Sequence, residues 1–242
     1  MKRLYVMLFL LCLFAFSAVA QEVTLPEPVS FFDFEETEGA VVTDQGTAGN
    51  NGEIVGAWID RVEGDGIITK PDETPHSIEF IEENAFGELT YVLIPYQEYM
   101  NSPNYTLSTW MKYVGEANWG YLFWADGETY EPEIVDRHID VWLHPYDGTL
   151  GVDCILNTDP EGELRVLNEP EETGIDLADG FWHQVTVTLE NNSIYKIYID
   201  GVWAAEGATG GDTTIVENIG DDMYLGARPN DANFETSVKL VG

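Results

Sequence analysis

Four histidines and 44 acidic residues are the side chains of this sequence that could act as acids, bases or metal ligands. The histidines are scattered along the chain: His76, His138, His144 and His183. A hydrolase triad needs a nucleophile, a base and an orienting acid brought together, and no Gly-x-Ser-x-Gly sequence accompanies any histidine. A zinc site needs closely spaced ligands. The histidines therefore predict neither kind of site, and we expect His183 to be structural.

Acidic residues could instead cleave glycosidic bonds, because glycoside hydrolases use two carboxylates across one cleft. The nearest candidate runs are 131–136 and 136–140. The first contains Pro132 and is expected to be a loop, whereas the second places Asp136 and Asp140 on one strand face without a glutamate beside them. With so many acidic residues, such pairs arise by chance. We assign no catalytic residue, and a glycan-cleaving enzyme stays an alternative.

Aromatic residues indicate a different activity, the binding of carbohydrate. Indole and phenol rings stack on the apolar faces of sugars, and their polar atoms reach hydroxyl groups. Five aromatic residues lie in or beside predicted strands and are the candidate carbohydrate-binding residues: Trp119, Trp124, Trp142, Tyr198 and Trp203. Tyr198 points away from the expected core, because Ile197 and Ile199 alternate with it. The competing role, filling the core, fits three tryptophans: Trp110, Trp142 and Trp182.

Oxygen ligands for a hard cation gather in the segment 31–52. Asp33 lies near its start, and Asp44 leads a Gly/Asn-rich loop that ends at residues 50–52. Such loops offer carboxylate and carbonyl oxygens, which Ca²⁺ prefers. We predict that Asp33 and Asp44 hold a structural Ca²⁺ ion. Two alternatives stay open: plain Asx-turn hydrogen bonding by the same residues, and a calcium site in the acidic loop 126–136.

The charge of the chain restricts its partners. The formal net charge is −34, while 44% of the residues are hydrophobic and 12% are aromatic. That apolar content is enough for a packed core and argues against an acidic disordered tail. The negative charge repels phosphate backbones, so we expect no nucleic-acid partner. Its simplest role is a solvated surface that keeps the protein soluble.

The first twenty residues have the pattern of a signal peptide. A basic pair, Lys2 and Arg3, precedes the apolar run 4–16, and the small residues of 18–20 supply a cleavage site after Ala20. The run is shorter than the ~20 residues that a bilayer requires, and no second run could span a membrane. We therefore predict a secreted or cell-surface protein. Removal of two of the ten basic residues leaves eight against 44 acidic ones, a net charge of −36.

The remainder, residues 21–242, is expected to fold as one domain made of β-strands. Short runs of β-branched and aromatic residues are separated by Gly, Asn and Asp, and no segment has a helical period over ten residues. The predicted strands are 29–35, 77–81, 89–94, 105–113, 120–125, 138–143, 148–156, 164–167, 183–189, 194–199 and 202–205. Asp200-Gly201 is a tight hairpin turn. Loops are expected at 44–52, 61–75, 126–136 and 206–222. Many short strands with regular turns predict a two-sheet antiparallel sandwich.

Three segments in this order resemble concanavalin A-like, laminin-G-like jelly-roll domains of exported bacterial proteins. FFDFEETEGAVVTDQGTAGNNGEIVGA (31–57) is similar to the opening strand and loop, YTLSTWMKY (105–113) to the central strand, and GFWHQVTVTLENNSIYKIYIDGVWAAEG (180–207) to the Trp-His strand and Tyr-x-Asp-Gly hairpin. MYLGA (223–227) is similar to the penultimate strand. The resemblance implies a jelly-roll β-sandwich, and some such domains hold calcium at their edge.

The C-terminal end departs from that family pattern. Val238-Lys239-Leu240 can represent the last strand, but Thr236 lies where an acidic residue is usual. This weakens the calcium prediction, and we expect the chain to be part of a longer protein. The resemblance implies an exported carbohydrate- or glycoprotein-binding accessory or adhesion module with a structural calcium ion. The alternatives are a glycan-cleaving enzyme of the same fold and a structural spacer of a cell-surface protein that binds no glycan.

Overall fold

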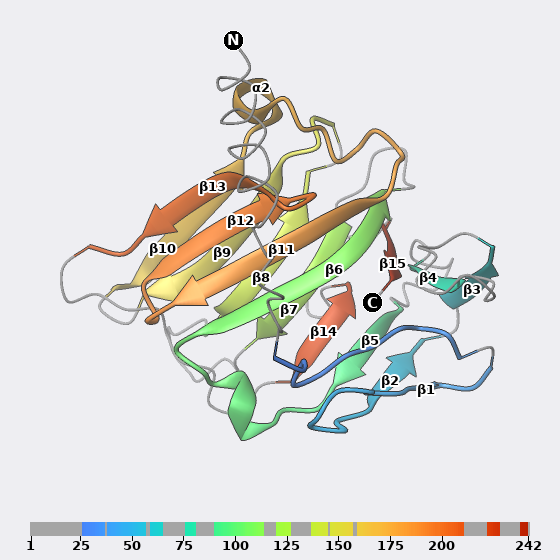
Figure 1. Ribbon diagram of the computed structural model, residues 1–242. Helices are drawn as coiled ribbons and strands as arrows, with labels where there is room; N and C mark the ends of the chain where they lie inside the picture. The colour runs from blue at the N-terminus through green and yellow to red at the C-terminus, as the bar shows by residue number, and fades with distance from the viewer. Residues whose placement is uncertain are drawn as a thin grey trace, which may run out of the picture.

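Two antiparallel β-sheets lie face to face in the computed structural model of the protein (Figure 1). The structure describes residues 26–36, 38–56, 59–64, 76–80, 90–113, 120–126, 137–144, 146–156, 159–210, 222–227 and 238–241. Eight strands in these ranges form one sheet and seven form the other. The predicted all-β, two-sheet antiparallel jelly-roll sandwich is confirmed.

The eight-stranded sheet contains the strands of the N-terminal part together with the middle of the chain. In spatial order its members are β1 (Val41–Val42), β2 (Gly52–Val55), β5 (Tyr91–Ile94), β14 (Met223–Gly226), β7 (Gly120–Asp126), β8 (Arg137–Leu143), β9 (Leu150–Leu156) and β10 (Asp159–Asn168). Strands β7 to β10 are consecutive in sequence and adjacent in space. Strand β14 lies between β5 and β7, so this sheet is complete only when residues 223–226, near the end of the chain, have joined it.

The seven-stranded sheet contains the hairpins of the C-terminal third. In spatial order its members are β13 (Val202–Ala208), β12 (Ile194–Ile199), β11 (His183–Glu190), β6 (Tyr105–Tyr113), β15 (Val238–Val241), β4 (His76–Phe80) and β3 (Ile59–Glu63). The last strand, β15, pairs with both β6 and β4. The run 238–240 therefore forms the terminal strand that the sequence predicted, and it lies inside the sheet.

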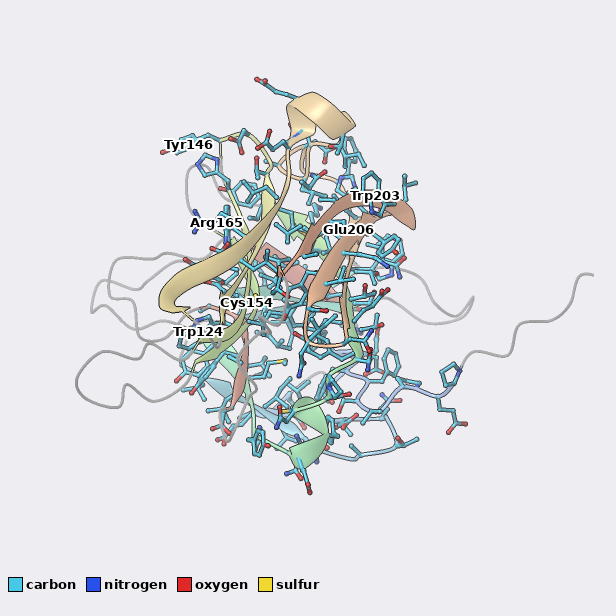
Figure 2. All side chains as sticks on the ribbon, turned by 90° about the vertical axis from the view of Figure 1, so that its left-hand side faces the viewer. Trp124, Tyr146, Cys154, Arg165, Trp203 and Glu206 are labelled. Carbon is cyan, nitrogen blue, oxygen red and sulfur yellow. The ribbon has the colours of Figure 1, made fainter. Side chains whose placement is uncertain are left out.

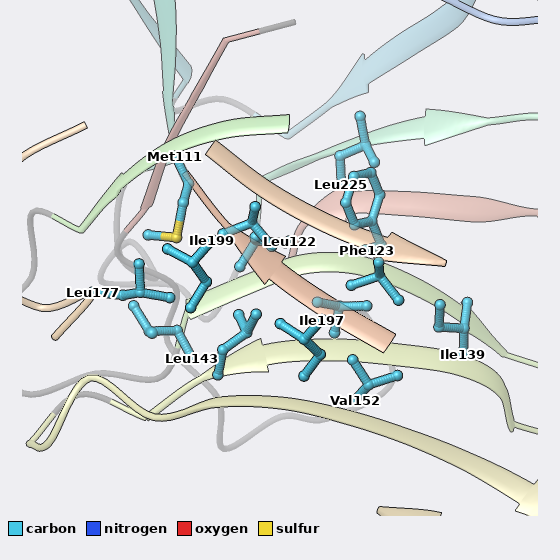
Figure 3. Packing of buried hydrophobic residues seen from close by; sticks show 14 of the residues in the cluster. Met111, Leu122, Phe123, Ile139, Leu143, Val152, Leu177, Ile197, Ile199 and Leu225 are labelled. Atoms are coloured by element: carbon cyan, nitrogen blue, oxygen red, sulfur yellow. The ribbon is translucent and has the colours of Figure 1, made fainter. Parts of the chain in front are cut away.

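The hydrophobic core lies between the sheets, where the alternation of the strands places it. On β11 and β12, the inward residues are buried with at most 1% exposure: Val185, Val187, Leu189, Ile197 and Ile199. Their register is direct, with Val187 opposite Ile197 and Val185 opposite Ile199. Figure 3 shows Ile197 and Ile199 packed among side chains of the other sheet. Burial of each large aliphatic side chain stabilises the fold by roughly 1.5–3 kcal/mol.

Tight turns join the strands where the sequence predicted them. Asp200 and Gly201 have φ values of 51° and 75°, and both are positive as a two-residue hairpin turn requires. Asn191 and Asn192 do the same between β11 and β12, with φ values of 53° and 50°. Asparagine and aspartate tolerate this region better than other side chains do. These turns fix the register of the three-stranded unit β11–β13.

Two predictions about the N-terminal third are wrong. The run 29–35 is not a strand: Phe34 has a φ of 56°, which breaks an extended backbone, although its ring is buried. This run instead packs beside the loop 44–48, where Gln45 N–H donates to the Phe31 carbonyl at 2.7 Å. The expected loop 61–75 begins inside strand β3, because residues 59–63 pair with β4. Charged residues within β3 hid this strand from the sequence pattern.

Helices contribute little to the described part of the chain. It contains the four-residue helix α2 (Pro170–Thr173) and the 3₁₀ turn η1 (Glu98–Met100). Neither is long enough to cross a bilayer, and no other helix in the described ranges is. The predicted signal peptide, residues 1–20, lies outside the described residues and stays a prediction.

Candidate functional site

The five predicted carbohydrate-binding residues do not form one site. Tyr198 and Trp203 lie on the outer face of the seven-stranded sheet, whereas Trp124 and Trp142 lie on the outer face of the eight-stranded sheet. Figure 2 shows Trp124 and Trp203 on opposite sides of the sandwich. Trp119 lies outside the described residues. The sandwich therefore offers two separate outer faces.

An outward-facing row crosses four strands of the seven-stranded sheet. Trp203 of β13 is directly opposite Tyr198 of β12, Tyr198 is opposite Thr186 of β11, and Thr186 is opposite Ser108 of β6. We call these four residues the aromatic–hydroxyl row. Trp203 is 59% exposed, and the Ser108 and Thr186 hydroxyls are 2.9 Å apart. Three inter-strand spacings give the row a length of about 14 Å.

The outward position of the row follows from alternation and from one irregularity. Thr186 alternates with the buried Val185 and Val187, as a half-buried strand requires. On β13, the register shifts between the partners of Ile197 and Tyr198, so that Trp203 faces Tyr198. A bulge of this kind re-aims side chains at the rim of a sheet. It presents the indole of Trp203 to solvent.

Polar and charged side chains flank the aromatic–hydroxyl row. On one side, Lys196 donates to Glu190 at 2.6 Å and lies opposite the exposed Glu206. The pKa of Lys196 is raised, chiefly by its hydrogen bond to Glu190. On the other side, Gln184 lies opposite Trp110. The row therefore combines apolar ring surface with hydrogen-bonding groups.

Trp110 extends this face, although the sequence favoured it as a core residue. It alternates with the buried Thr109 and Met111 and is only half-buried, outside the core cluster. That expectation is wrong because Trp110 shares the outward phase of Ser108. Trp182 is also half-buried, and the ammonium of Lys112 lies 5.9 Å from the centre of its ring.

The hairpin tip beside the row is held by hydrogen bonds to β11. Asp200 accepts from the Gln184 N–H at 2.9 Å, and its own N–H donates to the Gln184 carbonyl at 2.8 Å. The His183 ring bonds Asp200 through Nδ1 at 2.8 Å and Asp179 through Nε2 at 3.2 Å. Burial opposes the charged ring, but the two carboxylates outweigh it and raise the pKa of His183. His183 thus joins the hairpin tip to the loop that precedes β11.

The outer face of the eight-stranded sheet carries a different arrangement. Trp142 Nε1 donates to Asp153 Oδ2 at 2.9 Å, and Arg165 binds the same carboxylate through Nε at 2.8 Å and through a terminal nitrogen at 2.9 Å. The guanidinium also lies 5.9 Å from the centre of the Trp142 ring. Asp153 is almost fully buried. The bidentate ion pair with Arg165 compensates the charge of the buried Asp153 carboxylate.

Trp124 is 1% exposed, and its indole contacts Tyr224 at a centroid distance of 5.0 Å. Its rings therefore contact protein. Beside it, Asp140 lies directly opposite Asp153, and both are buried. Two facing carboxylates are what a glycosidase would need. However, both oxygens of Asp153 already accept hydrogen bonds from Arg165 and Trp142, so Asp153 is a poor nucleophile or base.

The two predicted calcium ligands lie in one loop but serve the backbone. Asp44 accepts from the N–H groups of Phe31, Gly46 and Asn50, each at 2.8 Å. Burial raises its pKa, yet these hydrogen bonds outweigh that effect and lower the pKa below its ordinary value. Asp33 binds the side-chain amide of Gln45. The structure therefore shows the Asx-turn chemistry that the sequence left open.

This loop does not fit a calcium ion at Asp44. Two N–H groups already bond its Oδ1 and a third bonds Oδ2, so few lone pairs remain for a cation that takes six to eight oxygens. Among the described residues, no three His, Cys, Asp or Glu side chains are grouped to hold a metal. The acidic loop 127–136 lies outside the described residues. Calcium stays a prediction.

Sequence reasoning missed the hydroxyl half of the aromatic–hydroxyl row and the Asp153–Arg165 ion pair. The alternation of β6 and β11 does indicate that Ser108 and Thr186 point outward. What it lacks is the pairing that brings residues 108, 186, 198 and 203 into line, because contacts between distant strands leave no periodic signal in either strand.

The sequence matches the model of the concanavalin A-like lectin/glucanase superfamily over residues 86–239. No curated protein matches it significantly. The match covers the strands β5 to β14 and reaches into β15. It therefore includes both outer faces described above.

Solved structures with the same fold include binding domains. The binding domain of Paraclostridial Mosquitocidal Protein 1 has a TM-score of 0.60 at 14% identity, over 89% of this chain and 47% of that one. The binding domain of Botulinum Neurotoxin DC, solved with SialylT, has 0.53 at 11%, over 88% and 45%. Domain 4 of AbnA, an extracellular arabinanase from Geobacillus stearothermophilus in complex with arabinotriose, has 0.52 at 18%, over 83% and 86%.

At these identities the likeness shows the fold alone. The chain spans less than half of the toxin binding domains, but most of the arabinanase domain.

Proposed function

Because the chain belongs to the concanavalin A-like lectin/glucanase superfamily, we propose that it is an exported carbohydrate-binding module, and that its aromatic–hydroxyl row is the binding surface. Such a module would anchor a longer parent protein to a polysaccharide or glycoprotein. The domains of similar fold are described as binding domains, and one was solved with arabinotriose, which supports the proposal.

The observation that carries it is the facing pair of the exposed Trp203 and the half-buried Tyr198 on the outer face of the sheet. The indole of Trp203 is 59% exposed, lies outside the core cluster and leaves apolar surface in contact with water, which is unfavourable. Stacking on the apolar face of a sugar ring would recover that area. The hydroxyls of Thr186 and Ser108 continue the row, and they can donate to and accept from sugar hydroxyls.

The net charge narrows the ligand class. At −34, the chain repels polyanions, so a neutral glycan fits better than a sulfated or uronate polymer. The local charges agree with this inference, because Lys196 is engaged by Glu190 and lies beside Glu206.

Binding is favoured over catalysis by the state of the buried facing carboxylates Asp140 and Asp153. Asp153 is held by Arg165 and Trp142, whereas a glycosidase needs an acid and a base that can exchange protons. A glycan-binding assay distinguishes binding from a spacer role.

Native affinity electrophoresis of the purified protein tests the proposal. Gels would contain soluble arabinan, hydroxyethylcellulose or polygalacturonate. We expect a neutral polymer to retard the wild-type protein. Trp203→Ala should weaken the affinity derived from the retardation at least tenfold, which corresponds to a loss of about 1.4 kcal/mol in binding free energy. Tyr146→Ala is the matched control: Tyr146 is 76% exposed and lies on the other side of the sandwich (Figure 2). Equal retardation of both variants, or no retardation of the wild type in any polymer, would contradict the proposal.

A further inference from the structure

We propose that His183 is a positioning residue for the aromatic–hydroxyl row, and that the row binds ligand only while the His183 ring carries both protons. This inference rests on the proposed function, because it concerns the regulation of the same surface.

Both nitrogens of the His183 ring face carboxylate oxygens. Nδ1 is 2.8 Å from Asp200 Oδ2, and Nε2 is 3.2 Å from Asp179 Oδ1. Ionised carboxylates only accept hydrogen bonds, so each ring nitrogen must donate. A neutral imidazole has a single N–H, and one of its two nitrogens would then direct a lone pair at a carboxylate. The geometry therefore favours the imidazolium, in which both nitrogens donate.

The two carboxylates belong to separate elements that the ring joins. Asp179 lies in the loop that precedes β11, and Asp200 is the first residue of the β12–β13 turn. These are the charged groups that the described residues direct at the ring. The nearby Lys112 ammonium is engaged with the ring of Trp182, and the cross-strand neighbour of His183 is the apolar Met111. With a side-chain exposure of 13%, the ring has little access to compensating water.

The turn that His183 holds lies between the two aromatic residues of the row. Tyr198 precedes Asp200 by two residues, and Trp203 follows it by three. Strand β13 is at the edge of the sheet, so Trp203 has a strand neighbour on one side only. Its position consequently depends on the turn. When the ring loses a proton, one of its two contacts becomes repulsive. Loss from Nδ1 weakens the attachment of the turn at Asp200, and loss from Nε2 releases the ring from Asp179, which then no longer holds it in place against the turn.

The expected pH dependence follows from these contacts. The charged ring is stabilised in the folded protein, so the competent state persists through the ordinary titration range of histidine, near pH 6.5, and is lost at higher pH. Above the His183 pKa the competent fraction falls tenfold per pH unit. The apparent Kd should then rise by about tenfold per unit until the unclamped state sets a plateau.

We call the joining of Asp179 and Asp200 by the protonated His183 ring the clamp. Two measurements on the full chain test it. The first is the indole ¹H–¹⁵N signal of Trp203, identified with Trp203→Phe, followed together with the ring ¹⁵N signals of His183 from about pH 5 to pH 9. The second is retardation in arabinan gels over the same range. We expect the Trp203 signal and the retardation to change with the His183 titration, and Asp179→Asn to move that midpoint down by about one unit, because one favourable charge is removed.

His183→Gln should abolish the pH dependence, whereas His144→Gln, which alters a His–Asp contact of 2.8 Å elsewhere, should leave it intact. A Trp203 signal that ignores the His183 titration would overturn the clamp, as would a midpoint that Asp179→Asn does not move. If no polymer is retarded at any pH while the Trp203 signal follows His183, the clamp stands and the proposed function fails. If a polymer retards the protein equally at every pH, the proposed function stands and the role of His183 fails.

Discussion

The indole of Trp142 lies directly against the backbone of Gly151 on the neighbouring strand. The two residues are cross-strand partners, and a Cβ atom at position 151 would approach the six-membered ring of Trp142 to 2.2 Å. Position 151 thus accepts no side chain unless the indole moves. The same indole donates to Asp153, so its placement and the buried ion pair of Asp153 depend on a missing methyl group.

We predict that Gly151→Ala destabilises the protein by about 1–3 kcal/mol, the usual cost of overpacking. The indole would have to leave the backbone and would lose its hydrogen bond to Asp153. Urea denaturation measures the change. Gly210→Ala is the control, since a Cβ there meets no atom within 4 Å. A Gly151→Ala variant as stable as Gly210→Ala would show that the indole can move freely.

Val187→Asp should prevent folding. Val187 is fully buried opposite Ile197 and Leu107, and an unpaired buried carboxylate costs several kcal/mol. Circular dichroism should show no cooperative thermal transition. Thr106→Asp introduces the same charge on the exposed face of the adjacent strand, and its effect should stay within about 0.5 kcal/mol. A soluble Val187→Asp protein with a normal transition would refute the register.

Asp44→Asn should lower stability, because the carboxylate accepts from the Phe31 N–H, which joins the run 28–31 to the loop 44–50, and from the Gly46 and Asn50 N–H groups within that loop. We expect a loss of about 1–3 kcal/mol at neutral pH, equal in EDTA and in millimolar calcium at constant ionic strength. Thermal melts in both buffers measure it. A loss confined to calcium would instead establish the ion that the sequence predicted at Asp33 and Asp44.

The lowered pKa of Asp44 gives this effect a definite pH window. A depressed folded pKa adds stability above the unfolded value of about 3.9, and the contribution disappears as pH falls through the folded pKa. The difference in urea midpoint between wild type and Asp44→Asn should therefore be constant from neutral pH to about pH 5 and shrink below pH 4. A difference that persists unchanged in acid would assign the effect to geometry alone.

His183 should act in the opposite direction. Its pKa is raised in the folded state by Asp200 and Asp179 against the effect of burial, so its contribution is full below about pH 6.5 and is lost as pH rises through the folded value. His183→Gln should lower the melting midpoint at about pH 6 by a few degrees, equivalent to roughly 1 kcal/mol. The deficit should diminish towards pH 9. An unchanging deficit would mean that the charge contributes nothing.

The sequence by itself determined the strands and their inward faces over most of the described chain. Alternation in residues 105–113 gave the bounds of β6 and placed Met111 inside and Ser108 outside. Asp-Gly and Asn-Asn gave the two turns of the β11–β13 unit. These features are local: a period of two follows from the pleat of a single strand, and a positive φ is a property of one or two residues.

Only the tertiary structure decided which of the candidate residues could act together. Trp124 and Trp203 have similar local sequence contexts on predicted strands, yet one is 1% exposed and the other 59%. Strand order placed Tyr198 between Trp203 and Thr186, and the packing of the run 28–31 beside the loop 44–50 brought the Phe31 N–H to Asp44. The physical reason is that the face of a side chain is set by its own strand, whereas its neighbours and its solvent exposure are set by segments far away in the sequence.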